Sequence, residues 1–343
     1  MLENKSSKFK AAAVQAAPVF MDLEGCVKKA EDYIRSAAAQ GCRLVAFSEC
    51  WIPGYPWYIW LNNTALNMKY FVDYHENSLV AGGEAFQAIA RLAKEYSIFV
   101  SMGASERDNG SLYISQFLFS PEGELISGRR KLKPTHMERT VYGEGDGSDL
   151  QVVDTTLGRI GQLSCWEHLQ PLTKYAMFSQ HEQIHLGAWP SFSTYPEAYA
   201  LGAELNNRAS QVYAAEGQCF VIAPCGMVSA EMIDLLVENE LHASLLSQGG
   251  GYAQIYGPDG KPLCTPLDPS EEGLLIAELD LQDITMAKCF ADPVGHYARP
   301  DVTRLLLNTD PQPRTDVLLT EPLPSRMEAL SLDTADEPLA AEL

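Results

Sequence analysis

The sequence predicts an α/β fold in which two similar sheets pack face to face with helices outside, a four-layer α-β-β-α sandwich. Three observations lead to this prediction. Apolar strand-like segments alternate with amphipathic segments of helical spacing along most of the chain. A strand, a Pro-x-Gly turn and a second strand occur twice, with the turns at 121–123 and 258–260. The 343 residues are 46% hydrophobic, which is enough for a sizeable core.

In the first half of the chain, we expect strands and helices to alternate from the start. Phe9–Gln15 is predicted to be a strand. Asp22 is placed to cap a helix over 23–39, and Gly41 follows its end. Two prolines and a glycine in Trp51–Pro56 predict irregular chain. The other elements predicted for this half are, in order, a strand at Leu44–Phe47, a helix over 84–96, a strand at Ile98–Met102, and a hairpin of Leu112–Phe119 and Glu124–Arg130.

In the second half, the apolar strand Leu157–Leu163 is followed by Glu167–Phe178, which has helical spacing. The other elements predicted here are strands at Gln151–Asp154 and Gln183–Trp189, a long helix over 195–216, a strand at Phe220–Ala223, a hairpin within Gln248–Leu263, and a strand at Leu274–Leu279. Residues 309–343 hold five prolines and eight acidic residues against two arginines. We therefore expect one domain over 1–308 and a tail over 309–343.

The composition excludes several classes of partner. A formal net charge of −20 disfavours binding to nucleic acid and to anionic membrane surfaces. There is no signal-peptide pattern and no uninterrupted apolar run of about 18 residues that would span a membrane. The eight cysteines include no CxxC pair, which is typical of reduced thiols in a cytoplasmic protein. We therefore expect a small-molecule partner.

Three reactive side chains follow predicted strands: Glu49, Lys131 and Cys165. Functional sites gather at the carboxyl ends of strands in open α/β sheets. A thiol, a carboxylate and an amine that meet there could act as nucleophile, base and electrostatic stabiliser. We expect the Cys165 sulfur at an exposed turn before a helix N-terminus, where its pKa would be lowered. Taken singly, each could instead be a capping carboxylate, a solvated strand end or a buried apolar thiol.

All five tryptophans lie just after these strand ends, at positions 51, 57, 60, 166 and 189. Converging aromatic side chains are typical of an apolar pocket with few polar groups. They are also typical of subunit interfaces. For the stretch Tyr55–Trp60, both interpretations stay open.

Three segments resemble the motif regions of the nitrilase superfamily, and in particular its nitrile-hydrolysing branch, the bacterial nitrilases. They are FSECWIPGYP (47–56), RRKLKPTHMERTVYGEGDGSDL (129–150) and SCWEHLQPLTKYAMFSQHEQIHLGAWP (164–190). The resemblance continues through EGQCFVIA (216–223), GGGYAQIYGPDG (249–260) and DPVGHYARPD (292–301), and so covers residues 9–305. Ser48 departs from the family pattern, which usually has proline before the glutamate.

The resemblance implies a role for each motif residue. Cys165 would be the nucleophile, Glu49 the general base, and Lys131 the cation that stabilises the tetrahedral species. Lys133 is a rival to Lys131, but the family pattern places its lysine directly after the arginine pair. Glu138 would orient Lys131 or the hydrolytic water. Trp166 would contribute its backbone N–H, Glu167 and His168 would support the site, and the expected pocket-wall residues are Trp166, Tyr142, Trp189 and Phe192.

The activity implied is hydrolysis of an organic nitrile to the carboxylic acid and ammonia through a cysteine thioimidate and a thioester, with amide as a minor product. The resemblance implies no metal and no organic cofactor. It also implies a nitrilase-type sandwich and a homodimer or larger homo-oligomer, in which Tyr55–Trp60 and the C-terminal segment are possible interface parts.

Three alternatives remain open at this stage. His181-Glu182-Gln183-Ile184-His185 spells the zinc motif H-E-x-x-H, but that motif works only on a helix, and Gln183–Trp189 is predicted to be extended. An amidase or N-carbamoyl amidohydrolase of the same superfamily would keep the fold and cleave another bond. A non-catalytic, oligomer-forming protein would need none of the reactive residues.

Overall fold

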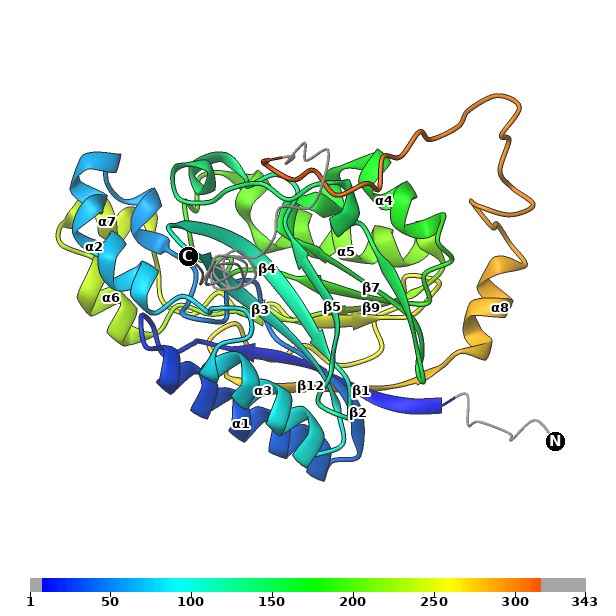
Figure 1. Cartoon of the computed structure of the whole chain (residues 1–343), viewed down its shortest axis with the longest axis horizontal. Helices are drawn as coiled ribbons and strands as arrows, with labels where there is room; N and C mark the ends of the chain where they lie inside the picture. Colours follow the sequence, from blue (N-terminus) through cyan, green and yellow to red (C-terminus); the bar gives the residue numbers. More distant parts are fainter. Residues whose placement is uncertain (1–7, 316–343) are drawn as a thin grey trace, which may run out of the picture. The chain divides into compact units, whose positions relative to one another are not determined.

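Two sheets organise the part of the chain that the computed structural model describes, residues 8–315 (Figure 1). By its internal contacts the chain divides into two units, with the boundary after Asp310. Of the second unit, only 311–315 are described. The predicted tail over 309–343 thus lies mostly outside the described residues, and its boundary stays a prediction.

The first sheet has seven strands in the order β10-β1-β2-β3-β4-β5, with β12 also paired to β1. The strands are β1 Lys8–Ala16, β2 Cys42–Ala46, β3 Phe99–Asp108, β4 Ser111–Phe119, β5 Leu125–Arg130, β10 Cys225–Gly226 and β12 Gly273–Asp280. β1, β2 and β3 are parallel, and β3, β4 and β5 continue as an antiparallel meander. The parallel strands bring their carboxyl ends to one edge of the sheet, where the turn containing Glu49 follows β2.

The second sheet has five strands in the order β11-β9-β8-β7-β6. They are β6 Val152–Thr155, β7 Gly158–Ser164, β8 Ile184–Ala188, β9 Phe220–Ala223 and β11 Gln254–Tyr256. β7, β8 and β9 are parallel. Polar contacts join the facing sheets, because Ser101 of β3 donates to Gln162 of β7 over 2.9 Å and Gln116 of β4 donates to the Leu186 carbonyl of β8 over 3.3 Å.

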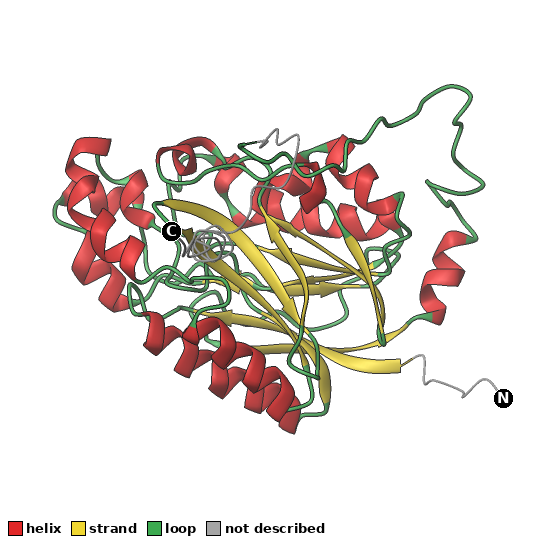
Figure 2. Cartoon of the chain, viewed as in Figure 1, coloured by secondary structure: helices red, strands yellow, loops and turns green. Residues whose placement is uncertain are grey.

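Helices cover the outer faces of both sheets (Figure 2). On the first sheet lie α1 Leu23–Ala39 and α3 Glu84–Glu95, which share an apolar core with β2 and β3. On the second lie α4 Pro171–Phe178 and α5 Ala203–Gly217, whose buried residues belong to the apolar cluster that contains most of this sheet's core. The four-layer α-β-β-α sandwich predicted from the sequence is confirmed.

The first helix agrees with its sequence signals. The Asp22 carboxylate accepts the backbone N–H of Gly25 over 2.9 Å and so caps α1. One face of this helix is buried, and it consists of Cys26, Ala30, Ile34 and Ala37. Burial of that stripe against the sheet explains why a helix forms where the apolar spacing predicts one.

The helix predicted over 195–216 begins only at Ala203, after a short 3-10 turn at Tyr199–Leu201. The backbone N–H of Tyr195 donates to the carbonyl of Leu245 over 2.8 Å. This bond ties the segment to a distant part of the chain. The spacing of apolar residues does not reveal such a long-range contact. The prediction of a helix was therefore wrong for the first residues of the segment.

The second half of the chain is not a plain repeat of the first. β12 crosses to the first sheet and pairs antiparallel with β1 from Gly273 to Asp280. Of the hairpin predicted within 248–263, only β11 joins a sheet, and Tyr256 and Pro262 form a single bridge. The Pro-x-Gly turns therefore recur without the same strands on both sides.

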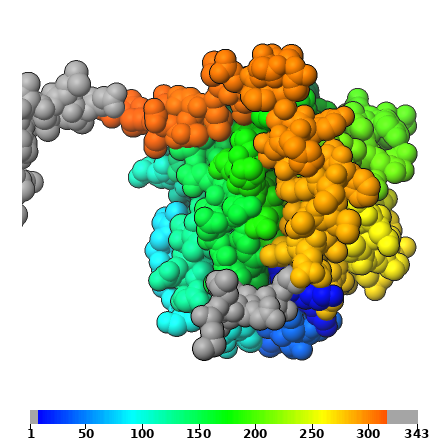
Figure 3. Space-filling model, turned by 90° about the vertical axis from the view of Figure 1, so that its right-hand side faces the viewer, coloured from blue at the N-terminus to red at the C-terminus, as the bar shows by residue number. Residues whose placement is uncertain are grey.

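Four helices occupy segments for which the sequence predicts no element: α2 Thr64–Glu76, α6 Ala230–Leu236, α7 Glu240–Leu245 and α8 Gln282–Lys288. After α8, residues 290–308 (orange in Figure 3) continue along the outside of the first unit, and the Asn308 carbonyl lies against Gly147. Among the described residues, no helix combines the length and the apolar character needed to cross a membrane.

Candidate active site

Glu49 lies in a tight turn directly after β2. Its backbone N–H donates to the carbonyl of Trp189 over 3.3 Å, which joins the turn to the end of β8 in the other sheet. Gly103 of β3 passes so close that a side chain there would overlap the Ser48 carbonyl oxygen and lie 3.2 Å from the Glu49 Cα. The Glu49 carboxylate is buried. Close backbone packing therefore fixes where this carboxylate points.

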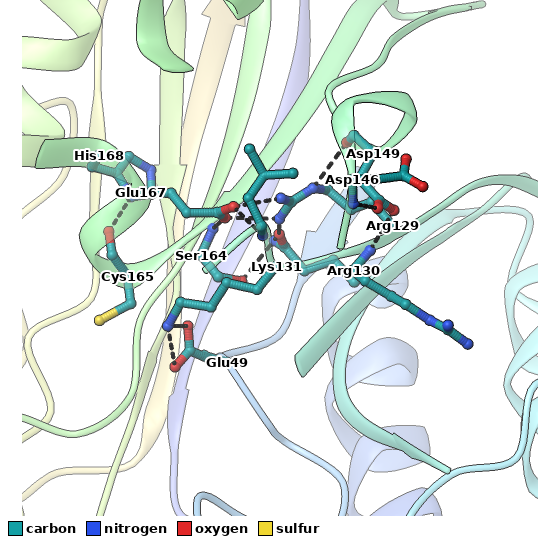
Figure 4. Close-up of polar contacts among 12 residues, drawn as sticks. Glu49, Arg129, Arg130, Lys131, Asp146, Asp149, Ser164, Cys165, Glu167 and His168 are labelled. Carbon is teal, nitrogen blue, oxygen red and sulfur yellow. Dashed lines mark hydrogen bonds and ion pairs between the residues drawn. The ribbon is translucent and has the colours of Figure 1, made fainter. Parts of the chain in front are cut away.

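Lys131 follows β5 and is also buried. Its ammonium donates to Glu49 Oε2 over 3.3 Å and to Glu138 Oε2 over 2.8 Å. Figure 4 shows the Lys131 side chain reaching the Glu49 carboxylate, with the Cys165 sulfur nearby. Lys133, the rival lysine, is exposed and pairs with Glu144. The structure thus brings Lys131, and not Lys133, to the other candidate residues.

Glu138 is the second carboxylate that binds the Lys131 ammonium. It lies in a 3-10 turn at His136–Thr140, and its Oε2 also accepts the backbone N–H of Thr135 over 2.6 Å. The hydroxyl of Tyr55 donates to its Oε1 over 2.9 Å. The structure therefore adds Tyr55 to the site, a residue for which the sequence suggested only a pocket or an interface.

Cys165 directly follows β7 and begins a 3-10 turn over Cys165–Leu169, with a left-handed φ of 50°. The expected long helix from Glu167 is interrupted, because α4 starts anew at Pro171. The sulfur is not at an exposed turn, since only 8% of Cys165 is accessible. The Cys165 sulfur and oxygens of Glu49 and Glu138 all lie within 4.8 Å of one another. Residues far apart in the sequence thus meet at one point.

Burial sets the ionisation of this cluster. It raises the pKa of the Cys165 thiol well above its ordinary value, opposed by Lys131 and reinforced by Glu49 and Glu138. Burial alone would lower the pKa of the Lys131 ammonium, but the two carboxylates outweigh it and hold that pKa well above its ordinary value. The expectation of a lowered thiol pKa was wrong, because desolvation exceeds the effect of the turn. The sulfur therefore rests as a thiol and needs a base.

Glu167 joins the loops that carry Lys131 and Cys165. Its carboxylate forms a bidentate ion pair with the Arg129 guanidinium, over 2.9 and 2.7 Å. It also accepts hydrogen bonds from the backbone N–H groups of Leu132 over 2.9 Å and Ser164 over 2.8 Å. Burial alone would raise the pKa of Glu167, but Arg129 and these N–H groups lower it overall. Arg129 was not among the predicted site residues, although it lies in the motif beside Lys131.

A small cavity opens over Cys165. Its walls are Tyr55, Trp57, Trp60, Thr135, Glu138, Trp166, Pro190, Ser191, Phe192, Thr194, Leu201 and Asn206. A second, outer cavity shares Trp60, Thr135, Trp166 and Leu201 with it and adds residues such as His136 and Tyr195. The aromatic stretch after Glu49 therefore faces a pocket, and its role at a subunit interface stays a prediction.

Two of the four expected wall residues, Trp166 and Phe192, line the cavity, and two do not. Tyr142 lies behind it, where its hydroxyl bonds to Tyr74 over 2.5 Å. Trp189 stacks on His168, and its indole N–H donates to Ser210 over 2.9 Å. Whether a residue lines the cavity depends on the direction of its side chain. The spacing of residues around a turn does not reveal that direction.

One group of side chains in the described residues has metal-ligand spacing, and it is Glu49, Glu138 and Cys165. The Lys131 ammonium already bonds to both carboxylates. A metal ion would have to displace this cation or bind beside it against like-charge repulsion. The donor set therefore fits an ammonium better than a resident metal.

The H-E-x-x-H run does not form one helical face. His181 is exposed in the turn after α4, whereas Glu182 is buried and His185 is buried in β8. Both ring nitrogens of His185 already have partners, Glu182 at 2.7 Å and His168 at 2.9 Å. This arrangement differs from the helical zinc site that the motif requires.

Comparisons with known proteins place this geometry in a wider context. A family model described as carbon-nitrogen hydrolase matches residues 10–288. A protein named nitrilase from Pseudomonas syringae pv. syringae (strain B728a) is 53% identical over 330 residues, which cover 96% of this chain and 98% of that protein. A protein named arylacetone-specific nitrilase from Alcaligenes faecalis is 51% identical over 300 residues, which cover 87% of this chain and 84% of that protein.

Among solved structures, the NitFhit protein of C. elegans superposes with a TM-score of 0.68 at 19% sequence identity. The match covers 88% of this chain and 68% of that one. At this identity the likeness shows a common fold.

Proposed function

The chain belongs to the carbon-nitrogen hydrolase family and to its nitrilase branch, and from this premise we propose how its own residues act. It is a hydrolase of nitriles. Cys165 is the nucleophile, Glu49 the general base, Lys131 the electrostatic stabiliser and Glu138 the group that holds Lys131. The observation that carries this assignment is the meeting of a thiol and two carboxylates within 4.8 Å around one ammonium.

In the first half of the reaction, the Cys165 sulfur adds to the nitrile carbon. Glu49 takes the thiol proton and passes it to the nitrile nitrogen, which leaves a covalent thioimidate. The raised pKa of the Cys165 thiol supports this step, because a thiol that is protonated before the reaction needs a neighbouring base to remove its proton. The backbone N–H of Trp166, which lowers the pKa of the Cys165 thiol, is in place to meet the charge that develops beside it.

In the second half, Glu49 activates water, which adds to the thioimidate carbon. Lys131 stabilises the tetrahedral intermediate, ammonia leaves after protonation, and a thioester remains. A second water releases the carboxylic acid and restores the thiol. The balance is one nitrile and two waters to one acid and one ammonia. An intermediate that expels sulfur instead of ammonia releases the amide, which we propose as a minor product.

The wall of the cavity supports neutral, apolar nitriles as substrates. Four aromatic side chains line it, Trp57, Trp60, Trp166 and Phe192, and Glu138 is the one carboxylate in the described lining. A negatively charged substrate would be repelled by that carboxylate. It would also give up its hydration shell without gaining a cation or hydrogen-bond donor in return.

Replacement of the nucleophile tests the assignment. The Cys165→Ala variant should lose nitrile hydrolysis to below about one part in a thousand of the wild type, since nothing replaces the covalent step. The matched control is Cys225→Ala, which removes another buried thiol, bonded to the Pro190 carbonyl over 3.1 Å. Acid, amide and ammonia should be measured separately with a nitrile and its amide. Retained activity in Cys165→Ala, or faster turnover of the amide by the wild type, would contradict the proposal.

Three broader features remain proposals. We propose one catalytic domain over 1–308 with a separate tail, a cytoplasmic location, and a homodimer or larger assembly. The assembly is supported by exposed apolar side chains on α2, namely Leu66, Met68, Phe71 and Val72. Light scattering that finds a strictly monomeric active species would overturn it.

A further inference from the structure

Behind the nucleophile, four buried side chains form a continuous line of hydrogen bonds. The hydroxyl of Tyr213 in α5 donates to Glu182 Oε2 over 2.6 Å, and Glu182 Oε1 lies 2.7 Å from His185 Nδ1. His185 Nε2 lies 2.9 Å from His168 Nε2, and His168 Nδ1 lies 2.6 Å from the carbonyl oxygen of Cys165. Figure 4 shows this last contact.

The positions of the hydrogen atoms follow from the acceptor at the end of the line. A carbonyl oxygen cannot donate, so His168 Nδ1 must carry a hydrogen and donate to the Cys165 carbonyl. In a neutral ring, His168 Nε2 is then an acceptor, and His185 Nε2 must donate to it. His185 Nδ1 is left as an acceptor, so Glu182 must donate and is therefore a carboxylic acid. Every bond in the line then points toward the Cys165 peptide.

The environment favours this neutral arrangement. Burial lowers the pKa of His168 to about 3, with His185 adding to the shift, and burial lowers the pKa of His185 well below its ordinary value. Burial raises the pKa of Glu182 to about 8, although the bond from Tyr213 opposes the shift. The other ionisable groups nearby are the Arg129–Glu167 pair, whose charges balance, and the neutral thiol of Cys219.

The fold leaves space for this line. A Cβ at Gly187 of β8 would lie 2.9 Å from His168 Nε2, and a Cβ at Gly161 of β7 would overlap the Glu182 carboxyl group. The rings are clamped as well, since His185 stacks on Tyr213 with centroids 3.8 Å apart and His168 stacks on Trp189 at 5.0 Å. The side chains are therefore fixed by packing on both sides.

We propose that Tyr213, Glu182, His185 and His168 form a one-directional hydrogen-bond relay that positions and polarises the peptide bond between Cys165 and Trp166. This inference rests on the proposed function, because that peptide carries both the nucleophile and the Trp166 N–H that faces the sulfur. A hydrogen bond accepted by a peptide carbonyl strengthens the N–H of the same peptide as a donor. It also holds the carbonyl of a residue kept at a left-handed φ of 50°. The four residues are positioning residues and do not contact substrate.

Two variants at His168 test the relay. In His168→Leu the Cys165 carbonyl loses its donor, and we expect kcat to fall about 100-fold with KM within about threefold, as for loss of one preorganised donor. In His168→Asn the amide nitrogen can take the place of Nδ1 and donate to the same oxygen, so kcat should recover by about tenfold over the leucine variant. Equal losses in the two variants, or losses that match the fraction unfolded, would show a merely structural role.

A test that does not depend on those variants concerns the proton of Glu182. Glu182→Gln keeps a donor toward His185 and an acceptor for Tyr213, so its kcat should stay within about threefold of the wild type. The infrared difference between the wild type and this variant should show the carbonyl stretch of a carboxylic acid. A carboxylate band would overturn the direction of the relay. Failure of these tests while Cys165→Ala stays inactive would refute the relay alone, whereas an active Cys165→Ala would refute the proposed function.

Discussion

At the scale of single residues, the site consists of two carboxylates, one ammonium and one thiol that are buried together, and their charges determine its ionisation. The Lys131 ammonium bonds to both Glu49 and Glu138, which leaves one negative charge in excess. That excess and burial together keep the thiol protonated. The proposed nucleophile would thus be activated only when a substrate is present to receive the proton, which guards a buried cysteine against side reactions.

The pH dependence of activity should report the Glu49 carboxylate. Burial raises its pKa above the ordinary value, Lys131 opposes that shift and Glu138 adds to it. A general base must be ionised, so kcat/KM should rise as pH rises through this raised pKa, which lies above the ordinary value of about 4.3. Glu138→Gln removes a negative charge near Glu49, and the Lys131 ammonium then pairs with Glu49 alone. The pKa of Glu49 should fall, so the rise of kcat/KM on the acid side of the profile should move to lower pH. Measured pH profiles in which the limb stays in place or moves upward would contradict this assignment.

The meeting of the proposed catalytic residues could be predicted because each follows a strand end within a distinctive motif, whereas their supporting contacts could not. Arg129 and Tyr55 act through contacts with residues 38 and 83 positions away. No local pattern specifies such partners. The H-E-x-x-H run illustrates the converse, since a familiar spacing in extended chain places Glu182 and His185 in the relay.

The neighbouring arginines Arg129 and Arg130 allow a matched comparison of buried and half-exposed ion pairs. Arg129→Met leaves the Glu167 carboxylate buried without its cation, so unfolding free energy should fall by about 3–5 kcal/mol. Because Glu167 also holds the loops of Lys131 and Cys165, kcat of the folded fraction should fall as well. Arg130→Met removes a partly exposed arginine that pairs with the buried Glu106 and with Asp108. Because the Ser115 hydroxyl still donates to Glu106 over 2.6 Å, the cost should be smaller, about 1 kcal/mol. Urea unfolding and initial rates measure both effects, and equal costs would refute the distinction.

At the scale of secondary-structure elements, the site depends on how β3 supports the turn after β2. The Ser101 carbonyl accepts the N–H of Phe47 over 2.9 Å, and the Gly103 carbonyl accepts the N–H of Ile52 over 3.3 Å. β3 thus continues pairing past the end of β2 and holds both sides of the Glu49 turn. The strand was predicted only over 98–102, because the alternation of apolar residues does not reveal this extension to Asp108.

A side chain at Gly103 should therefore act on catalysis through the backbone. In Gly103→Ala the new methyl group would overlap the Ser48 carbonyl and push the Glu49 turn away, since both neighbours are backbone atoms. We expect a loss of about 1–3 kcal/mol in unfolding free energy and, because Glu49 moves, a fall in kcat of about tenfold or more.

The matched control is Gly110→Ala in the turn between β3 and β4. An added Cβ there meets no atom within 4 Å. Thermal unfolding and kcat should both stay close to the wild type. A Gly103→Ala variant as active as Gly110→Ala would show that Glu49 is positioned by other contacts.

At the scale of the whole molecule, the order of apolar and amphipathic segments sufficed to predict two sheets between two layers of helices. It did not suffice to assign β12, which leaves its neighbours in sequence and pairs with β1 of the other half. Such long-range pairing depends on the assembled sheet. The site needs this assembly, because Glu49 and Lys131 come from one sheet and Cys165 from the other.

The charge of the whole molecule leads to a prediction on substrate selection. The chain carries a net charge of −20, and the described lining of the cavity contains the Glu138 carboxylate. We compare 4-nitrophenylacetonitrile with its 4-carboxylate analogue, which has nearly the same shape and one negative charge. The anion should be repelled on approach and left unpaired in the cavity, so its kcat/KM should be at least about tenfold lower. Added salt screens the approach but not the buried contact, so it should narrow the gap without closing it. Equal rates at low salt would mean that a cation outside the described lining receives the carboxylate.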